Sequence, residues 1–588
     1  MKPYWANNNV YEFYDNFLKE SIIGNDSYLT DDKNEFTLEN INACVSSFVD
    51  KPDTSSRSFD EKASDQFKDA NSGMKLVFAH CIWLWSHAAG DMTQWGKKNA
   101  VVRFLGDEKS SSLKDVFIKG GIGSAGQWHK QNKPFEISYA LLLLKYIKQH
   151  LVPECNNDIQ KLKELIVKLC LDLYYQRYEE LKPESEKLQK VVSERQLALH
   201  HILLHLSDFD AFEPITSNNH KSRIVSTFYT LLGISKPDKL WSDIDGSILK
   251  IRTALSDIMN RKDLAFYDQD IARAWNYHDS EWGIDSVELF EYKKALILYG
   301  PPGTSKTHSA YQLSEMLISK HYFRNKEKVK EYFSNKDEII SSHTHFLQLH
   351  TNFSYEDFIA GIHLDDHKTV AKKGWLLNLI EKVKDDELPH IVILDEINRV
   401  DLSRLFGELF SGIEYRDKPV QITVGNSDFE INVPSNLYFI GTMNEIDFSL
   451  ERVDFALRRR FLWEFKGFDS DILREILNQK NSSVQVESEV LEGYISRCSN
   501  LNEKISNEPE LGKKYQIGHT FFGEVLDIAS TFKNIHGSRK DSFKKLSGPS
   551  KILWGISIQP MLEAYFGNMD EQTRIEKLAE FEKVFMND

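Results

Sequence analysis

The chain has 588 residues, of which 41% are hydrophobic and 27% charged, and its formal net charge is -15. A chain of this length is too long to fold around a single hydrophobic core, so about two to four folded units are expected. The acidic balance counts against a protein that coats nucleic acid through general electrostatics, because neutralising phosphates needs concentrated Lys and Arg, and any DNA contact is expected to be local.

The first 240 residues are predicted to form a mostly α-helical domain. Apolar residues recur at spacings of three and four, which is typical of helices that bury one face. The segments with this pattern are residues 139–147, 159–175 and 197–206. We expect residues 1–240 to recognise a target or bind a partner.

Two groups of aromatic and imidazole side chains in this half have alternative interpretations. Trp83, Trp85 and Trp95 could stack on a flipped base, although such tryptophans more often fill a core. His200, His201 and His205 place two imidazoles at the four-residue spacing of a metal pair, but without an adjacent acid motif we favour a half-buried helix face.

A turn-rich stretch around residues 233–245 predicts a boundary, followed by a connecting helical segment over residues 241–290. After it the pattern changes to short apolar strands that alternate with turns and helices. The predicted strands are residues 295–299, 346–349, 391–394 and 437–440. This alternation favours a parallel sheet with crossover helices over residues 291–465. Helical spacing then returns over residues 466–588 and predicts a helical lid.

The strongest local signal is a phosphate-binding loop between the first of these strands and a helix. It fits G-x-x-x-x-G-K-[ST] except at its sixth position, where serine replaces glycine, and it comprises Gly300, Pro301, Pro302, Gly303, Thr304, Ser305, Lys306 and Thr307. Backbone N–H groups and the helix N-terminus cradle phosphates in such loops. Lys306 is expected to reach the β and γ phosphates, and Thr307 to bind Mg²⁺.

Polar residues follow two later strands. Asp395 and Glu396 end the strand at residues 391–394, about ninety residues after the loop. Asp395 is expected to hold the magnesium shell and Glu396 to polarise the attacking water. Asn444 follows the strand at residues 437–440, where its amide could orient that water.

A basic cluster follows at the end of a short predicted helix. It contains Arg458, Arg459 and Arg460. A guanidinium aimed at the γ phosphate of a neighbouring subunit would stabilise the transition state in trans, and Arg458 and Arg459 are the candidates. The alternatives are a helix C-terminal cap or a DNA contact.

Two alternating segments, residues 420–424 and 429–433, flank a turn and predict a β-hairpin. Its role could be structural, or it could face a pore or a partner, as such inserts do in relatives of the family that the motifs resemble.

Taken together, these motifs resemble the McrB branch of AAA+ proteins, over about residues 290–570. The matching segments are Y-E-D-F-I at residues 355–359, D-E-I-N-R at 395–399, G-T-M-N at 441–444, the run 454–461, and the lid segments 517–522 and 558–566. In the family hallmark M-N-x-x-D-R, Asn444 and Asp447 are retained, and Phe448 stands where the family has arginine.

The resemblance implies an AAA+ P-loop NTPase with catalytic residues Glu396, Asn444 and Asp447, using Mg²⁺ and either ATP or GTP. It further implies a homo-oligomer, with six subunits in a ring, that translocates DNA and activates a separate nuclease subunit similar to McrC in antiphage defence. The alternatives are a protein-remodelling ATPase of the related MoxR branch and a nucleotide-switched defence sensor.

The compartment is predicted to be the cytoplasm. The start of the chain lacks a leader pattern, and the longest apolar stretches fall far short of the roughly 20 residues that span a bilayer. Five cysteines are scattered without a C-x-x-C pair, which argues against a disulfide framework and a thiolate zinc site.

Overall fold

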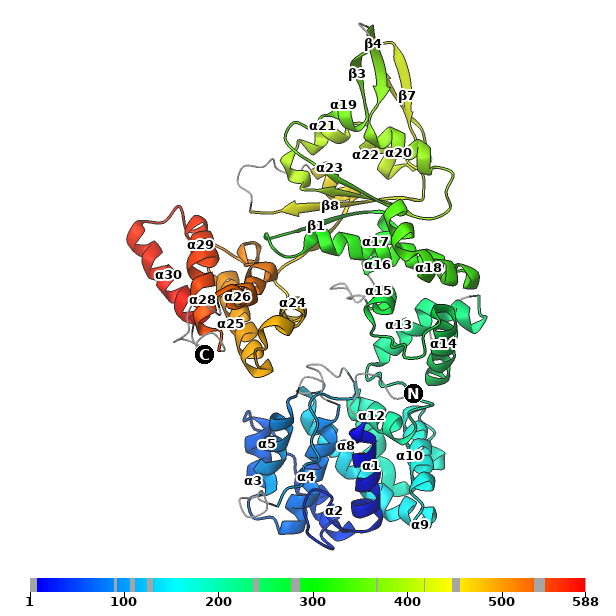
Figure 1. Cartoon of the computed structure of the whole chain (residues 1–588), viewed down its shortest axis with the longest axis vertical. Coiled ribbons are helices and arrows are strands. Elements are labelled where there is room, and N and C mark those ends of the chain that lie inside the picture. Colours follow the sequence, from blue (N-terminus) through cyan, green and yellow to red (C-terminus); the bar gives the residue numbers. More distant parts are fainter. Residues whose placement is uncertain are drawn as a thin grey trace. The chain divides into compact units, whose positions relative to one another are not determined.

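The computed structural model describes residues 8–88, 92–105, 112–123, 129, 131–235, 243–276, 286–365, 368–416, 418–446, 455–532 and 545–586. The chain divides into two compact units, Met1–Asn276 and Tyr277–Asp588. Figure 1 shows that helices make up the first unit and that the second combines a sheet, hairpins and helices.

Helices are the regular secondary structure of the described residues of the first unit, and irregular segments connect them. Its α-helices are α1 (Asn9–Phe17), α2 (Leu38–Cys44), α3 (Phe59–Gln66), α4 (Ser72–Ser86), α5 (Gln94–Leu105), α8 (Lys133–Tyr146), α9 (Val152–Cys155), α10 (Ile159–Tyr174), α11 (Glu186–Glu194), α12 (Ala198–Ser207), α13 (Asn218–Phe228), α14 (Ile244–Met259) and α15 (Gln269–Trp275). α4 and α8 are apolar on almost every side and run through the middle of the main core, whereas the amphipathic α10 covers it with one face. The expected helical pattern is confirmed.

The tryptophans of α4 belong to this core. Trp83 is completely buried and donates its ring N–H to the Val116 carbonyl at 3.0 Å, and Trp85 is also buried. Trp95 on α5 is 66% exposed. The two buried rings therefore do not form a surface for a flipped base.

The three histidines of α12 are buried rather than half-buried. His200 Nδ1 lies 2.9 Å from the Tyr139 hydroxyl, and His205 Nε2 lies 2.8 Å from the Tyr11 hydroxyl. Burial lowers the pKa of His205 to about 4, so it is neutral at neutral pH. These imidazoles serve as hydrogen-bonding groups of the core.

The first unit extends past residue 240, where the sequence predicted its end. α14, expected in a connecting segment, packs against α13 and is held there by a buried ion pair. Lys221 Nζ lies 2.7 Å from Asp245 Oδ1 and 3.1 Å from His201 Nδ1. Both side chains are at most 5% exposed, so this pair ties α14 to the helical unit.

The second unit is built on a five-stranded sheet in the order β2-β5-β8-β1-β9, and all of its neighbouring strands are parallel. The strands are β1 (Ala295–Gly300), β2 (Thr344–Gln348), β5 (His390–Asp395), β8 (Leu437–Asn444) and β9 (Leu462–Phe465). β1, β5 and β8 are nearly continuous apolar runs, as expected of central strands covered on both faces. The predicted parallel sheet is confirmed.

Helices connect and cover these strands. They are α16 (Ser286–Lys293), α17 (Lys306–Tyr322), α18 (Lys326–His343), α19 (Tyr355–Phe358), α20 (Trp375–Val383), α21 (Leu402–Phe406), α22 (Leu409–Glu414) and α23 (Phe455–Arg460). α17 packs on β1, β5 and β8.

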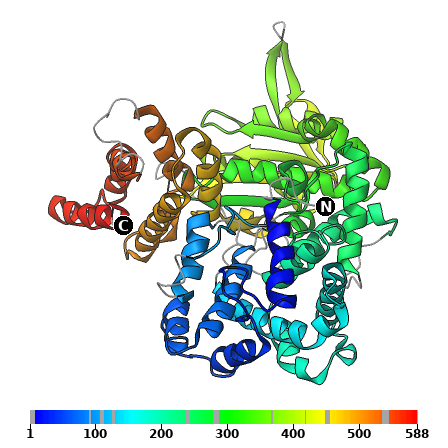
Figure 2. The ribbon, with the colours of Figure 1, turned by 60° about the horizontal axis from the view of Figure 1, so that its bottom comes forward.

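Two antiparallel hairpins extend from this unit. The predicted one is confirmed as β6 (Val420–Val424) and β7 (Ser427–Ile431). The other, β3 (Ala360–Asp365) and β4 (Lys368–Lys373), was not predicted from the sequence. Figures 1 and 2 show the hairpins projecting away from the parallel sheet.

A separate helical bundle follows β9. Its helices are α24 (Ser470–Val484), α25 (Ser488–Asn507), α26 (His519–Phe532), α28 (Ser547–Leu553), α29 (Gln559–Tyr565) and α30 (Glu571–Met586). They enclose a core of their own around Tyr494, Phe522 and Phe585. We refer to residues 466–586 as the lid. Within the described part of the chain, no helix combines the length and apolarity that crossing a membrane requires.

Candidate nucleotide-binding site

The phosphate loop joins the end of β1 to the start of α17, in the context that the sequence predicted. Gly303 has φ +74°, which favours glycine. Ser305 also adopts the left-handed conformation, at φ +55° and ψ +31°, immediately before the helix. The backbone at this position therefore takes a conformation that suits glycine, and the serine accepts a local strain of about 1 kcal/mol.

Lys306 lies inside the loop rather than at its surface. Its Nζ donates to the carbonyls of Pro301 at 2.6 Å and Gly300 at 3.2 Å. The residue is 7% exposed. Burial lowers the pKa of the Lys306 ammonium to about 8, against the opposing effect of Asp395. The loop thus already holds this ammonium beside its own backbone.

Asp395 lies at the centre of a hydroxyl network at the carboxyl edge of the sheet. Thr307 Oγ1 donates to Asp395 Oδ1 at 2.8 Å, and Thr442 Oγ1 donates to the same oxygen at 2.6 Å. The Glu396 backbone N–H in turn donates to Thr442 Oγ1 at 3.2 Å. Side chains from α17, β5 and β8 are thereby fixed around one carboxylate.

This pair of oxygen ligands fits a magnesium site. Mg²⁺ prefers hard oxygen ligands and is usually held by one or two protein groups together with phosphate and water. The Thr307 hydroxyl and the Asp395 carboxylate lie in hydrogen-bond contact next to the loop, as such a site requires. These two residues would hold the ion.

Glu396 follows Asp395 in a left-handed conformation, at φ +57°. This turn carries its side chain to Arg399, with which it forms a two-point ion pair that includes an Arg399 Nη2 to Glu396 Oε1 hydrogen bond of 3.1 Å. Both oxygens of the carboxylate are therefore engaged by the same guanidinium. Opening this ion pair would free both carboxylate oxygens to act on a water molecule.

Asn444 reaches the same edge as the loop. Its Cα pairs with that of Gly300 in the parallel register of β1 and β8. Its carbonyl accepts a 2.8 Å hydrogen bond from the Asn398 amide, which fixes the end of β8 to the segment after Glu396. Asp447, the other residue expected at this position, lies outside the described residues.

The start of α26 in the lid contacts the phosphate loop directly. The Thr520 backbone N–H and hydroxyl donate to the Gly303 carbonyl at 3.1 and 3.0 Å. A Cβ at Gly518 would meet that carbonyl at 2.2 Å, so only glycine fits. His519 Nε2 lies 2.8 Å from Ser305 Oγ, so the serine that departs from the loop motif contacts the lid.

The three arginines of α23 differ in their surroundings. Arg460 Nη2 pairs with Glu414 Oε2 at 2.8 Å, and its side chain is 15% exposed. Arg459 pairs with the same carboxylate at 2.7 Å and is 69% exposed. Arg458 is exposed and lies over the Trp463 ring at 5.6 Å. The exposed pair, Arg458 and Arg459, are the ones that the sequence singled out for a role in trans.

The structure thus brings the loop, Asp395, Glu396 and Asn444 to one edge of the sheet. Sequence reasoning assigned no role to Arg399, Thr442 or His519. Arg399 belongs to the D-E-I-N-R segment and Thr442 to the G-T-M-N segment. Their closeness in sequence to Glu396 and Asn444 was the signal that could have marked them. His519 had only the lid resemblance to mark it.

Comparison with known proteins agrees with this geometry. Residues 295–461 match the AAA domain (dynein-related subfamily). Over 239 residues the chain is 36% identical to the Type IV methyl-directed restriction enzyme EcoKMcrB subunit of Escherichia coli (strain K12), covering 39% of this chain and 47% of that protein. The chain therefore matches less than half the length of this curated relative. The second unit contains an AAA+ domain of the P-loop NTPase type, and the matched part of the chain is similar to the McrB subunit.

Two solved structures show weaker likeness. A RuvB mutant from Thermotoga maritima is 13% identical, with 50% of this chain and 77% of that chain covered and a TM-score of 0.26. A predicted ATPase from Cytophaga hutchinsonii is 13% identical, with 55% and 84% covered and a TM-score of 0.22.

Proposed function

We propose that this chain is a Mg²⁺-dependent nucleoside-triphosphate hydrolase that acts as the motor subunit of a modification-dependent restriction system. The observation that carries the hydrolase assignment is the meeting of Lys306, Asp395 and Glu396 at the carboxyl edge of one parallel sheet. The restriction context rests on the likeness to the McrB subunit.

Each side chain at this edge has a task in phosphoryl transfer. The loop backbone and the start of α17 bind phosphate oxygens, and Lys306 turns its ammonium from the loop carbonyls to the β and γ phosphates. Thr307 and Asp395 would hold Mg²⁺, which would supply positive charge against the phosphates. Asn444 orients the attacking water from the end of β8.

Glu396 is the residue that polarises this water. Its two oxygens each contact Arg399, so opening of this ion pair would free the carboxylate for the water. A γ phosphate near Arg399 offers the guanidinium an alternative anionic partner and would release the carboxylate. Nucleotide binding would in this way switch on the base that hydrolysis needs.

The catalytic site is completed by a second copy of the chain. Arg458 and Arg459 are exposed on α23, a position from which they can meet a neighbour's γ phosphate. Such a contact requires a neighbouring subunit, and we propose a closed ring of six subunits on the strength of the McrB resemblance. The ring translocates DNA and activates a separate nuclease subunit, since the sequence has no evident nuclease constellation of its own.

The test is steady-state hydrolysis of ATP and GTP by the full chain with Mg²⁺, with and without double-stranded DNA. Lys306→Ala should abolish turnover, and Glu396→Gln should abolish turnover while retaining nucleotide binding. Lys320→Ala is the matched control, because Lys320 lies near the other end of α17 and pairs with Glu291.

The outcomes discriminate between functions. Turnover that is restricted to GTP or raised by DNA would support the restriction motor. Turnover of ATP that is indifferent to DNA would favour protein remodelling instead. Equal turnover by Lys306→Ala and the unchanged protein would contradict the assignment of the site.

A further inference from the structure

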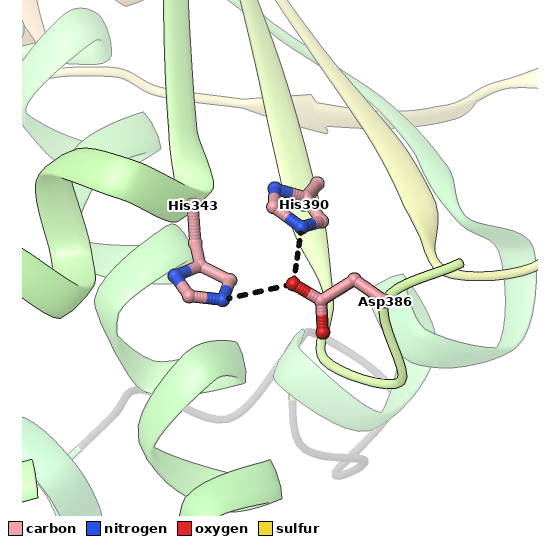
Figure 3. Close-up of side chains that lie close together, drawn as sticks. All are labelled: His343, Asp386 and His390. Atoms are coloured by element: carbon pink, nitrogen blue, oxygen red, sulfur yellow. Dashed lines mark hydrogen bonds and ion pairs between the residues drawn. The ribbon is translucent and has the colours of Figure 1, made fainter. Parts of the chain in front are cut away.

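A cluster of imidazoles lies at the amino edge of the sheet, opposite the phosphate loop. His343 ends α18, His390 begins β5, and Asp386 lies in the segment between α20 and β5. β2 and β5 are adjacent and parallel, with Thr344 paired to Ile391, so their starts bring the two histidines together. Figure 3 shows the three side chains pointing toward one another.

The ligand atoms have the spacing of a metal site. His390 Nε2 lies 3.0 Å and His343 Nε2 lies 3.6 Å from Asp386 Oδ2, and the three atoms are all within 4.8 Å of one another. Ligands of a tetrahedral zinc ion with bonds near 2.0–2.1 Å stand about 3.3 Å apart. The two imidazole rings are stacked, with centroids 4.6 Å apart and an angle of 18° between their planes, so one ring must rotate for both Nε2 atoms to face the same ion.

His343 presents its ring in the form that a metal binds. Its Nδ1 donates to the Ile339 carbonyl at 2.8 Å, which leaves Nε2 with a lone pair. That Nε2 is buried and has no hydrogen-bond partner. A buried acceptor without a donor costs free energy, and a cation beside Asp386 would remove this cost.

His390 and Asp386 also make contacts that fix their orientation. His390 Nδ1 lies 3.1 Å from His345 Nε2, and the Leu388 N–H donates to Asp386 Oδ1 at 2.9 Å. Such outer contacts orient ligands in metal sites. Asp386 is 37% exposed, whereas both histidines are at most 10% exposed, so an ion would enter past the carboxylate.

We propose that His343, Asp386 and His390 form a divalent transition-metal site that takes Zn²⁺. Two imidazoles and one carboxylate are ligands that suit zinc, whereas Mg²⁺ and Ca²⁺ prefer oxygen ligands. The ion joins the end of α18, the segment before β5 and the first residue of the strand that ends in Asp395. It stabilises the second unit and takes no part in hydrolysis.

The test uses the full chain without a histidine tag, from which metals have been removed with a chelator. Zn²⁺ is titrated in the presence of excess Mg²⁺, so that Mg²⁺ rather than Zn²⁺ fills the site at Asp395. Bound zinc is counted by equilibrium dialysis with elemental analysis, and Co²⁺ absorption reports the coordination. We expect one equivalent of zinc and an increase in the thermal unfolding temperature on binding.

The variants are His343→Ala, His390→Ala and Asp386→Asn, with His321→Ala as the matched control. His321 also faces a carboxylate, with its Nε2 3.3 Å from Glu291 Oε1, but that carboxylate is already paired with Lys320 and Arg324. Loss of an outer contact alone costs metal sites about 10- to 100-fold in affinity, so loss of a ligand should cost more than about tenfold. His321→Ala should bind zinc as the unchanged protein does.

Nucleotide binding checks that each variant is folded. If an alanine variant unfolds, Asp386→Asn tests the metal site instead, because it is a same-size change at a partly exposed side chain. The proposal is overturned if the unchanged protein binds no zinc equivalent, or if Asp386→Asn retains its full affinity and Co²⁺ spectrum.

Discussion

Thr442 offers a sharp test of how the hydroxyl network supports the magnesium site. The side chain is buried, donates to Asp395 Oδ1 at 2.6 Å and accepts from the Glu396 N–H at 3.2 Å. Thr442→Val keeps the shape and removes both interactions. Loss of such an outer contact costs metal sites about 10- to 100-fold in affinity, so the apparent Mg²⁺ affinity should fall by about that factor.

The assay is fluorescence anisotropy of a labelled non-hydrolysable nucleotide, titrated with Mg²⁺, so that no turnover is needed. Thr423→Val is the control, because the Thr423 hydroxyl also donates to an aspartate, Asp428, at 2.8 Å, but at an exposed site. A surface change of this kind should stay within about 0.5 kcal/mol, or roughly twofold. A Thr442→Val protein whose Mg²⁺ affinity changes by no more than the control would refute the reasoning.

Three further outcomes are expected. Burial lowers the pKa of Lys306 to about 8, and bound phosphate favours its charged form. Nucleotide affinity, measured in a binding titration, should therefore fall about tenfold between pH 7 and pH 9. Lys306→Arg should show no such fall, because arginine stays charged over this range. Ser305→Ala should lower the thermal unfolding temperature more than Ser305→Gly, since both lose the His519 contact but only glycine relieves the left-handed strain. Lys221→Met should destabilise the first unit by about 3–5 kcal/mol in urea unfolding, because Asp245 stays buried and unpaired, and adding Asp245→Leu should recover much of that loss.

Much of the nucleotide site was predictable because its parts are local. The phosphate loop is eight consecutive residues between a strand and a helix, and its backbone geometry depends on those residues themselves. Asp395, Glu396 and Asn444 could be assigned to the same place because parallel strands present their carboxyl ends at one edge. The helical character of the first unit was likewise visible in its apolar spacing.

The β3–β4 hairpin could not be predicted in this way. β3 has apolar residues at every second position, at Ala360, Ile362 and Leu364, but the strand is short and Ile362 and Leu364 are exposed. β4 is mostly polar and shows no such alternation, so the pair lacked the pattern of two half-buried strands. The end of the first unit was also misplaced, because a buried ion pair between Lys221 and Asp245 holds α14 to α13 across a turn-rich segment.

Contacts between distant segments were decided by the tertiary structure alone. The sequence marks Ser305 as a departure from the loop motif, but only the fold places His519 of the lid 2.8 Å from its hydroxyl. Asp386 and His390 stand four residues apart but not on one helix, and His343 is distant along the chain, so the three meet only because two parallel strands start side by side. Residue type and local spacing determine which chemistry a segment can carry, whereas packing of elements far apart in sequence determines which of those groups meet.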